Sequence, residues 1–384
     1  MKRSTDRILT THVGSLPRSA RVADLIFARE RGEAVEEEKF EGVLDDAVRD
    51  VVKRQCAAGV DIVSDGEMSK ISYATYIKDR LTGFAGDSAR NPPADLEDFP
   101  TYLLKLAQAG GTPSYRRPRC VGPISVRTLE PLQRDIVRFQ AVLDAQPVTE
   151  AFLNAASPGV IALFQPNDYY SSHAAYLEAL ADAMRKEYEA IVMAGFILQI
   201  DSPDLGLGGH TLFKGRPVAE YQDLAALHVE ALNHALENCP AERVRMHICW
   251  GNYEGPHHHD VPMDIVLPIA LRAKPQALLF EAANPRHAHE WTLFRDLPIP
   301  QDKILIPGVI DSVTNFIEHP LLVAERIGRF ADIVGKERVI AGTDCGFSTF
   351  AGFGAVDPDI VYAKLRSLSD GAHIVSTRLW GRKQ

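Results

Sequence analysis

Short apolar runs alternate with helical patterns along most of this chain, and this alternation limits the fold more than any other feature. Several runs are apolar at nearly every position, which is typical of parallel strands buried on both faces. Glycines at 59, 195 and 335 follow three of the helical patterns, where a helix C-terminus favours glycine. The runs predict strands at 8–14, 60–65, 159–164, 196–201, 243–249, 277–281, 303–309 and 338–343. The helical patterns lie at 40–58, 172–194, 217–238, 260–273, 286–295, 320–334 and 358–369.

Eight strand–helix units in a chain of this length predict an α/β fold, a (β/α)8 TIM barrel, whose chemistry lies at the C-terminal strand ends. An open doubly wound sheet is the alternative. Residues 70–158 interrupt the alternation and carry nine prolines. We interpret this range as a long insertion after the second strand, with a short strand at 119–126 lying over the barrel mouth. Residues 1–384 would then form a single barrel domain covered by the insertion.

Composition and charge narrow the function classes. The net charge is −9 over 384 residues, and 46% of the residues are hydrophobic. An acidic chain without a clustered basic face is not expected to bind nucleic acid. The N-terminus lacks a signal-type apolar run, no 18 apolar residues occur in succession, and five widely spaced cysteines suggest no disulfide framework. We therefore predict a cytoplasmic protein that does not enter membranes.

Four residues at the ends of three predicted strands have side chains that suit a metal. His247 and Cys249 close RVRMHIC, Glu281 closes QALLFE, and Cys345 closes RVIAGTDC. Residues two apart on a strand point the same way, so His247 and Cys249 can share one ion. A single Cys or His here would more often be packing, but a carboxylate ending an apolar strand is costly to bury without a partner. Two thiolates, an imidazole and a carboxylate suit Zn2+.

Polar groups also close other predicted strands. Gly14 and Ser15 form a turn that can bind a substrate carboxylate through its N–H groups and hydroxyl, unless it is an ordinary turn. Glu67 and Asp201 lie after two further strands and can face one ammonium group or one transferred proton, the alternative being solvated loop acids.

Further polar residues near the predicted metal ligands are expected to play supporting parts. Asp344 precedes Cys345 and can orient the site or cap a helix. Three consecutive histidines at 257–259 cannot all aim at one ion, so we expect them to face solvent or substrate. His287 and His289 are expected near the site or on the surface.

The ordered motifs of this chain resemble those of the cobalamin-independent methionine synthase family. The similarity is to that family's C-terminal catalytic barrel and its short single-barrel relatives, which include the epoxyalkane:coenzyme M transferases, and it spans about 11–380. The motifs that carry it are THVGSLPR, SDGE, YRRPRCVGP, LQIDSPDL, HICWGN, FEAANPRHAHEW, PGVIDS and AGTDCGF.

The resemblance implies a role for each matching residue. His247, Cys249, Glu281 and Cys345 would bind zinc, with Glu281 yielding to the substrate thiol. The residues that hold the amino-acid part of homocysteine would be Gly14, Ser15, Glu67 and Asp201. The residues near the folate would be Arg119 and Cys120.

Two departures from the family pattern bear on the methyl donor. Val313 stands where the synthases have a proton-donating His, and the synthases' N-terminal half has no counterpart in this sequence. Asp201, Asp311 and the histidines at 257–259 are the candidate proton donors.

The sequence therefore predicts a zinc-dependent methyltransferase of methionine biosynthesis, similar to 5-methyltetrahydropteroyltriglutamate–homocysteine S-methyltransferase. Its partners would be a small-molecule thiol and an alkyl donor. The alternative at the same site is an epoxyalkane or hydroxyalkyl-thioether transferase or lyase of the coenzyme M type. A metal-free decarboxylase acting on uroporphyrinogen, which shares this barrel, would not need the four converging ligands. A structural zinc module would normally carry closely spaced Cys pairs. The identity of the donor and thiol, and whether the chain forms a homo-oligomer, stay open.

Overall fold

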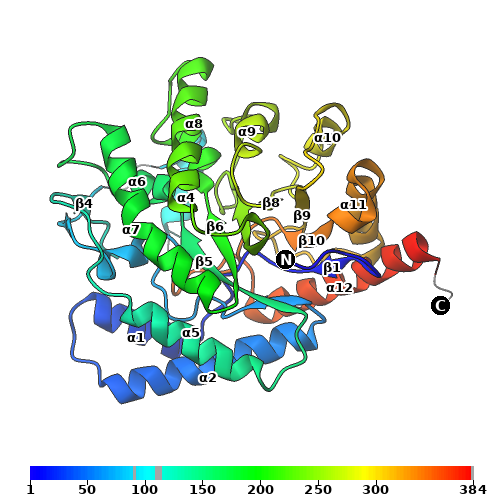
Figure 1. Cartoon of the computed structure of the whole chain (residues 1–384), viewed down its shortest axis with the longest axis horizontal. Coiled ribbons are helices and arrows are strands. Elements are labelled where there is room, and N and C mark those ends of the chain that lie inside the picture. The colour runs from blue at the N-terminus through cyan, green and yellow to red at the C-terminus, as the bar shows by residue number, and fades with distance from the viewer. Residues whose placement is uncertain (90–91, 109–114, 382–384) are drawn as a thin grey trace.

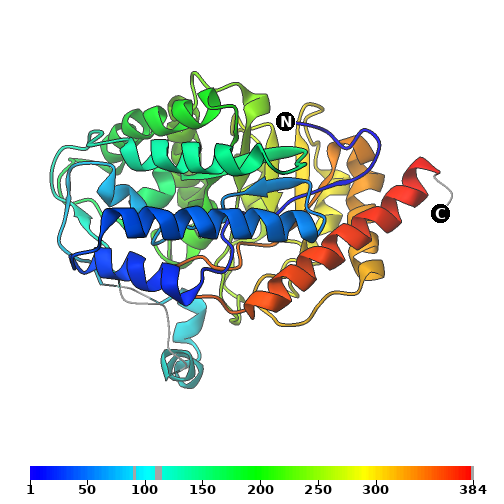
Figure 2. The same ribbon diagram turned by 90° about the horizontal axis from the view of Figure 1, so that it is seen from below.

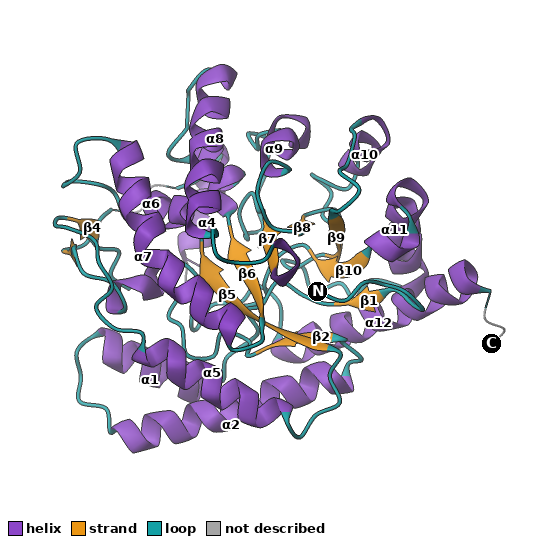
Figure 3. Cartoon of the chain, viewed as in Figure 1, coloured by secondary structure: helices purple, strands orange, loops and turns teal. Residues whose placement is uncertain are grey.

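A parallel sheet of eight strands curves into a barrel at the centre of the protein, with helices around it (Figures 1 and 3). The computed structural model describes residues 1–89, 92–108 and 115–381. The strands follow the order β1-β10-β9-β8-β7-β6-β5-β2 and every neighbouring pair is parallel. They are β1 (Leu9–Thr10), β2 (Ile62–Ser64), β5 (Glu150–Ala156), β6 (Ile197–Asp201), β7 (Val244–His247), β8 (Ala277–Phe280), β9 (Ile304–Ile310) and β10 (Ile340–Thr343).

The first and last strands of this order, β1 and β2, are joined by a few hydrogen bonds. Asp61 N–H donates to Thr10 O at 3.2 Å, and Thr11 Oγ1 donates to Ile62 O at 3.0 Å. The Asp61 carboxylate also accepts from Thr10 N–H at 2.9 Å. These contacts bring the sheet edges together, so the predicted (β/α)8 barrel is confirmed and the open doubly wound sheet is excluded.

The helices lie outside the barrel, and the largest apolar cluster fills the layer between helices and strands. The α-helices are α1 (Ala20–Glu30), α2 (Glu37–Ala57), α3 (Ala94–Glu97), α4 (Pro100–Gln108), α5 (Glu130–Leu143), α6 (Pro158–Phe164), α7 (His173–Met193), α8 (Val218–Ala235), α9 (Met263–Ala270), α10 (Leu293–Asp296), α11 (Pro320–Val334) and α12 (Pro358–Trp380). Short 3-10 turns are η1 (Thr75–Asp79), η2 (Pro203–Leu205), η3 (Leu207–His210), η4 (Ala241–Arg243), η5 (Glu290–Thr292) and η6 (Lys336–Arg338). None of the described helices is both long and apolar enough to cross a membrane.

The barrel interior changes from apolar to polar along the strands. A second apolar cluster includes Ile197 and Ala277, near the strand starts. Farther along, the buried Arg245 guanidinium donates to Gln199 Oε1 at 2.8 Å and to Thr11 Oγ1 at 2.9 Å, and lies 3.5 Å from the centre of the Phe152 ring. Alternate residues of a strand share a face, so Asp201 on β6 and His247 on β7 point inwards like Gln199 and Arg245. Both are polar and lie at the carboxyl ends of their strands.

The strand predicted at 159–164 is wrong. These residues belong to α6, whose N-cap Ser157 accepts a hydrogen bond from Val160 N–H and whose first residue is Pro158. Both are helix-start signals that the apolar run obscured. The third barrel strand is β5, just upstream, where Asn154 and small alanines interrupt the apolar pattern.

The segment expected to cover the barrel, 70–158, also needs correction because it contains α5 and β5, which belong to the barrel. What remains holds an antiparallel pair of short strands, β3 (Phe84–Ala85) and β4 (Arg119–Cys120), with α3 and α4 between them in the chain. In Figure 2 the cyan α4 stands out from the rest of the molecule.

The α3–α4 segment contacts the loop that follows β7. Tyr102 donates its hydroxyl to Glu254 O at 2.5 Å, and His257 N–H donates to Asp95 Oδ2 at 2.7 Å. The segment therefore lies at the carboxyl ends of the strands, which is the catalytic side of a barrel.

Candidate metal and substrate site

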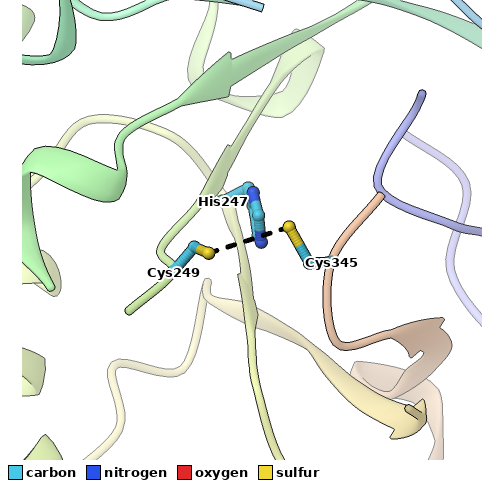
Figure 4. A group of neighbouring side chains, drawn as sticks. All are labelled: His247, Cys249 and Cys345. Carbon is cyan, nitrogen blue, oxygen red and sulfur yellow. Dashed lines mark hydrogen bonds between the residues drawn. The ribbon is translucent and has the colours of Figure 1, made fainter. Parts of the chain in front are cut away.

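Three of the four predicted metal ligands converge at the carboxyl ends of β7 and β10 (Figure 4). One ligand atom each from His247, Cys249 and Cys345 lies within 4.8 Å of the other two, and all three residues are buried. The two sulfur atoms are 3.7 Å apart and both cysteines are free thiols. A disulfide needs about 2.05 Å between sulfurs. Two sulfurs that share a tetrahedral zinc at about 2.3 Å each would lie roughly 3.8 Å apart.

Glu281 lies beside this cluster, but its carboxylate is held by other groups. Its Oε1 accepts from Trp250 N–H at 2.8 Å and its Oε2 accepts from the Asn284 side-chain amide at 2.7 Å. The hydrogen bond to Cys345, together with burial, raises the pKa of the Cys249 thiol well above its ordinary value. Burial and the neighbouring Cys249 likewise raise the pKa of Glu281. Several acidic groups buried together are costly to ionise unless a cation compensates their charge.

Asp344 fixes the loop that follows Glu281. Its Oδ1 accepts from the N–H groups of Ala282 and Ala283 at 2.8 and 2.9 Å. Its Oδ2 accepts from the Asn284 N–H at 2.8 Å and from the Asn284 side-chain amide at 3.1 Å. The side chain therefore ties the end of β10 to the end of β8, and so sets the position of Glu281 relative to Cys345.

Two buried carboxylates, those of Asp201 and Glu67, form an acidic group next to the cluster. Asp201 Oδ1 is 3.7 Å from His247 Nδ1, and Asp201 accepts hydrogen bonds from Gln199 at 2.9 Å and Asn154 at 3.0 Å. Glu67 is buried, and burial opposed by Lys70 but aided by Asp201 raises its pKa to about 7. Among the described residues, Glu67 Oε2 and Asn154 Oδ1 are buried without a hydrogen-bond partner. Since buried acceptors are normally satisfied, these two oxygens point to a missing donor.

The predicted Gly14–Ser15 turn lies close to Asn154 and Gly346. Gly14 has φ +133°, and a Cβ there would lie 2.3 Å from Asn154 Oδ1, so the close approach requires glycine. A Cβ on Gly346, the residue after Cys345, would lie 2.0 Å from Ser15 Oγ. The turn therefore packs against both Asn154, which contacts Asp201, and the segment that carries Cys345.

Three further predicted site residues bond to other partners. Arg119 is on β4 and pairs with Asp168, and the buried Cys120 thiol donates to Gly122 O at 3.5 Å. Asp311 follows β9, where its carboxylate accepts from Val313 N–H at 3.2 Å and Thr314 N–H at 2.9 Å. Asp311 thus organises its own loop.

Sequence reasoning missed two parts of the site. Asn154 was missed because its strand was misplaced, although the alternation of Phe152, Asn154 and Ala156 marks one face of a strand. The other part is a buried polar cluster around Asp260, whose carboxylate oxygens lie 2.5 Å from His210, 3.0 Å from His257 and 2.8 Å from His287.

The cluster around Asp260 lies against the residue that follows Cys249. The ring of His287 packs on Trp250 with 4.4 Å between ring centres. His287 is therefore near the candidate ligands rather than on the surface, and His257 is turned inwards.

The barrel carries a Cys–Cys–His group, next to two buried carboxylates, at the carboxyl ends of its strands, where the active sites of barrel enzymes lie. A family model described as "Cobalamin-independent synthase, Catalytic domain" matches residues 8–92. The chain is 27% identical over 376 residues to a methionine synthase of Saccharolobus solfataricus, covering 96% of this chain and 95% of the relative. A methionine synthase of Thermococcus kodakarensis is 25% identical over 376 residues, covering 96% and 94%. The chain is thus similar to the cobalamin-independent methionine synthase family.

Solved structures agree with this fold. The B12-independent methionine synthase from Shewanella sp. W3-18-1, in complex with selenomethionine, superposes with a TM-score of 0.71 at 21% identity, covering 98% of this chain and 99% of that one. A putative B12-independent methionine synthase from Listeria monocytogenes gives a TM-score of 0.64 at 17% identity, covering 96% and 99%.

Proposed function

We propose that this protein is a zinc-dependent methyltransferase that transfers a methyl group to the thiol of homocysteine. One observation carries the proposal: His247, Cys249 and Cys345 converge, with their two sulfurs 3.7 Å apart, as two ligands of one tetrahedral zinc would. The relatives named methionine synthase align over 96% of the chain, which supports the same reaction class.

The ligand set suits zinc and thiol chemistry. Zinc bound there would hold a substrate thiol as thiolate near neutral pH, well below the free thiol pKa of about 8.5. His247, Cys249 and Cys345 would supply three ligands. Glu281 would be the fourth and the one displaced by the substrate, because Trp250 N–H and the Asn284 amide can hold its carboxylate after displacement.

Glu67, Asp201 and Asn154 would orient the amino-acid part of the thiol substrate. An ammonium group carries three N–H donors, and Glu67 Oε2 and Asn154 Oδ1 are acceptors that lack a partner among the described residues. Asp201 would add a second negative charge. The hydroxyl and N–H of Ser15, beside Gly346, would bind the substrate carboxylate.

In the transfer itself, a new carbon–sulfur bond forms while the bond between the methyl group and its donor atom breaks, and the electron pair stays on that atom. A donor of folate type must then receive a proton. Asp311 is poorly suited to supply it because its oxygens accept from Val313 and Thr314. Asp201 is no better suited, because its oxygens accept from Gln199 and Asn154 and its negative charge would hold the ammonium group.

The coenzyme M type of reaction fits these residues less well. A sulfonate needs cationic or N–H donors, whereas Asp201, which lies 3.7 Å from His247, and Glu67, which interacts with Asp201, both carry carboxylates. We therefore place an amino-bearing thiol first.

The test combines metal analysis with an activity assay on the full chain. Cys249→Ala and Cys345→Ala should each lose nearly all zinc from the central site and all methionine formation while keeping the parent far-UV circular dichroism. Cys239→Ala is the matched control, since Cys239 is also a buried free thiol but is not part of the cluster. Methionine formation should be measured with folate, corrinoid and sulfonium donors. If either ligand variant kept full zinc at the central site, the metal centre would be wrongly assigned.

A further inference from the structure

A second group of potential ligands lies on the surface, where α3 meets the loop between β7 and α9. His258 Nε2 and His259 Nε2 lie 2.9 and 2.6 Å from the same oxygen of Asp98, Oδ2. The side chains of all three residues are between 37% and 52% exposed. Their ligand atoms lie within 4.8 Å of one another.

The expectation that the three consecutive histidines do not all aim at one ion still allows a pair to do so, and His258 and His259 both face Asp98 Oδ2. The two imidazole rings lie 4.1 Å apart, tilted by 35°, so both Nε2 atoms turn to the same side. The preceding His257 has φ +52°, a conformation rare for a residue other than glycine. Asp95 and Asp260 hold His257 in place, and the edge of Phe99 supports the His258 ring at 5.4 Å.

We propose that Asp98, His258 and His259 form a second metal site, which takes a divalent transition ion of the zinc class. Two imidazoles and one carboxylate are ligands that zinc, cobalt and nickel accept, and open positions would be filled by water. Ligands about 2.05 Å from a tetrahedral ion lie roughly 3.3 Å apart. The nitrogens need to move away from Asp98 Oδ2 by only about 0.4 to 0.7 Å, which exposed side chains can do by small rotations.

An ion at this site would join two separate parts of the chain. Asp98 belongs to the α3–α4 segment, and the two histidines belong to the loop that starts just after Cys249. Asp95 already fastens the same two parts from the buried side, through Tyr253 and His257. The ion would add a cross-link at the surface and hold α3–α4 against the barrel mouth. This inference does not depend on the proposed methyl transfer.

Cobalt titration of the untagged, metal-free protein separates the two sites. The central site contains two thiols, so its cobalt complex should show a thiolate-to-metal charge-transfer band, whereas the surface site should add only weak d–d absorption. We expect two bound ions per parent chain, of which only the tighter gives the charge-transfer band. The double variant His258→Gln/His259→Gln should keep that band and weaken the second ion at least about tenfold, since even losing a residue that merely orients a ligand costs 10–100-fold.

The control is His234→Gln, because exposed His234 pairs with a single carboxylate, Asp182, and has no second histidine beside it. This variant should bind both ions as the parent does. Amide hydrogen exchange at residues 92–108 should slow when the second ion binds the parent, and should not change in the double variant. The surface metal site would be refuted if the parent bound no ion besides the one that gives the charge-transfer band, or if the double variant kept that further ion. Unchanged exchange in the parent would refute the fastening of α3–α4.

Discussion

Asp344→Asn tests whether the hydrogen bonds of Asp344, rather than the ligands alone, set up the candidate metal centre. The carboxylate accepts four hydrogen bonds from the loop that follows Glu281. An asparagine keeps one oxygen but places an NH2 group against two donors of Asn284. Hydrogen bonds to a charged group contribute about 1.5–3 kcal/mol each, so two lost bonds set an upper limit of about 3–6 kcal/mol. Because Asn284 is only half-buried, and because burial raises the pKa of Asp344 to about 7 and so makes its ionised form costly, we expect a net loss well below this limit.

Two measurements check this expectation. Burial raises the pKa of Asp344 to about 7, so the free energy of unfolding should be measured in urea at pH 8, where the carboxylate is ionised. The protein should be metal-free, because a bound ion adds its own stabilisation. Zinc affinity, measured by competition with a chelator, should fall by about 10–100-fold although every proposed ligand is still present.

Asp61→Asn is the matched control for Asp344→Asn. Asp61 also accepts from a backbone N–H and a hydroxyl, both of Thr10, but it precedes β2 at the opposite end of the barrel. Asp61→Asn should lower stability without changing zinc affinity. If Asp344→Asn bound zinc as tightly as the parent, the position of Glu281 would not depend on the hydrogen bonds of Asp344.

Three further predictions concern the substrate pocket. Asp201→Asn should weaken binding of homocysteine at least about tenfold but that of a simple alkyl thiol little, since a charge-assisted hydrogen bond contributes about 1.5–3 kcal/mol; equal losses would argue against an amino-bearing thiol. The pKa of Glu67 is raised to about 7, so its contribution to the free energy of unfolding is fully present below about pH 4.5 and is lost as the pH rises through 7. The free energy of unfolding of Glu67→Gln, measured in urea, should not show this decrease between about pH 4.5 and 7. Polyglutamylated methyltetrahydrofolate should be a poor donor for the natural chain, and Val313→His should partly restore its use, since a positioned acid contributes about 10²–10⁴-fold; rapid methionine formation by the natural chain would show that another residue donates the proton.

Local sequence determined the barrel and the positions of the ligands. Parallel strands that are buried on both faces must be apolar almost throughout, so a His, Cys or Glu at the end of such a run is conspicuous, as His247, Cys249 and Cys345 were. The same rule failed where a strand is not apolar. β5 carries Asn154 and small alanines, whereas the neighbouring apolar run at 159–164 is a helix whose start signals, Ser157 and Pro158, are short and local.

The tertiary structure decided which side chains meet. The sequence alone could not show that Glu281 is held by Trp250 N–H, or that Asp344 binds the loop beyond β8, because these contacts join residues 31 and 60–62 positions apart. It also could not bring Asp98 to His258 and His259, 160 and 161 positions away, since α3 reaches them only through the packing of an insertion on a loop. Hydrophobic periodicity reports which face of a strand or helix is buried, but the partner of a polar side chain depends on the closed barrel.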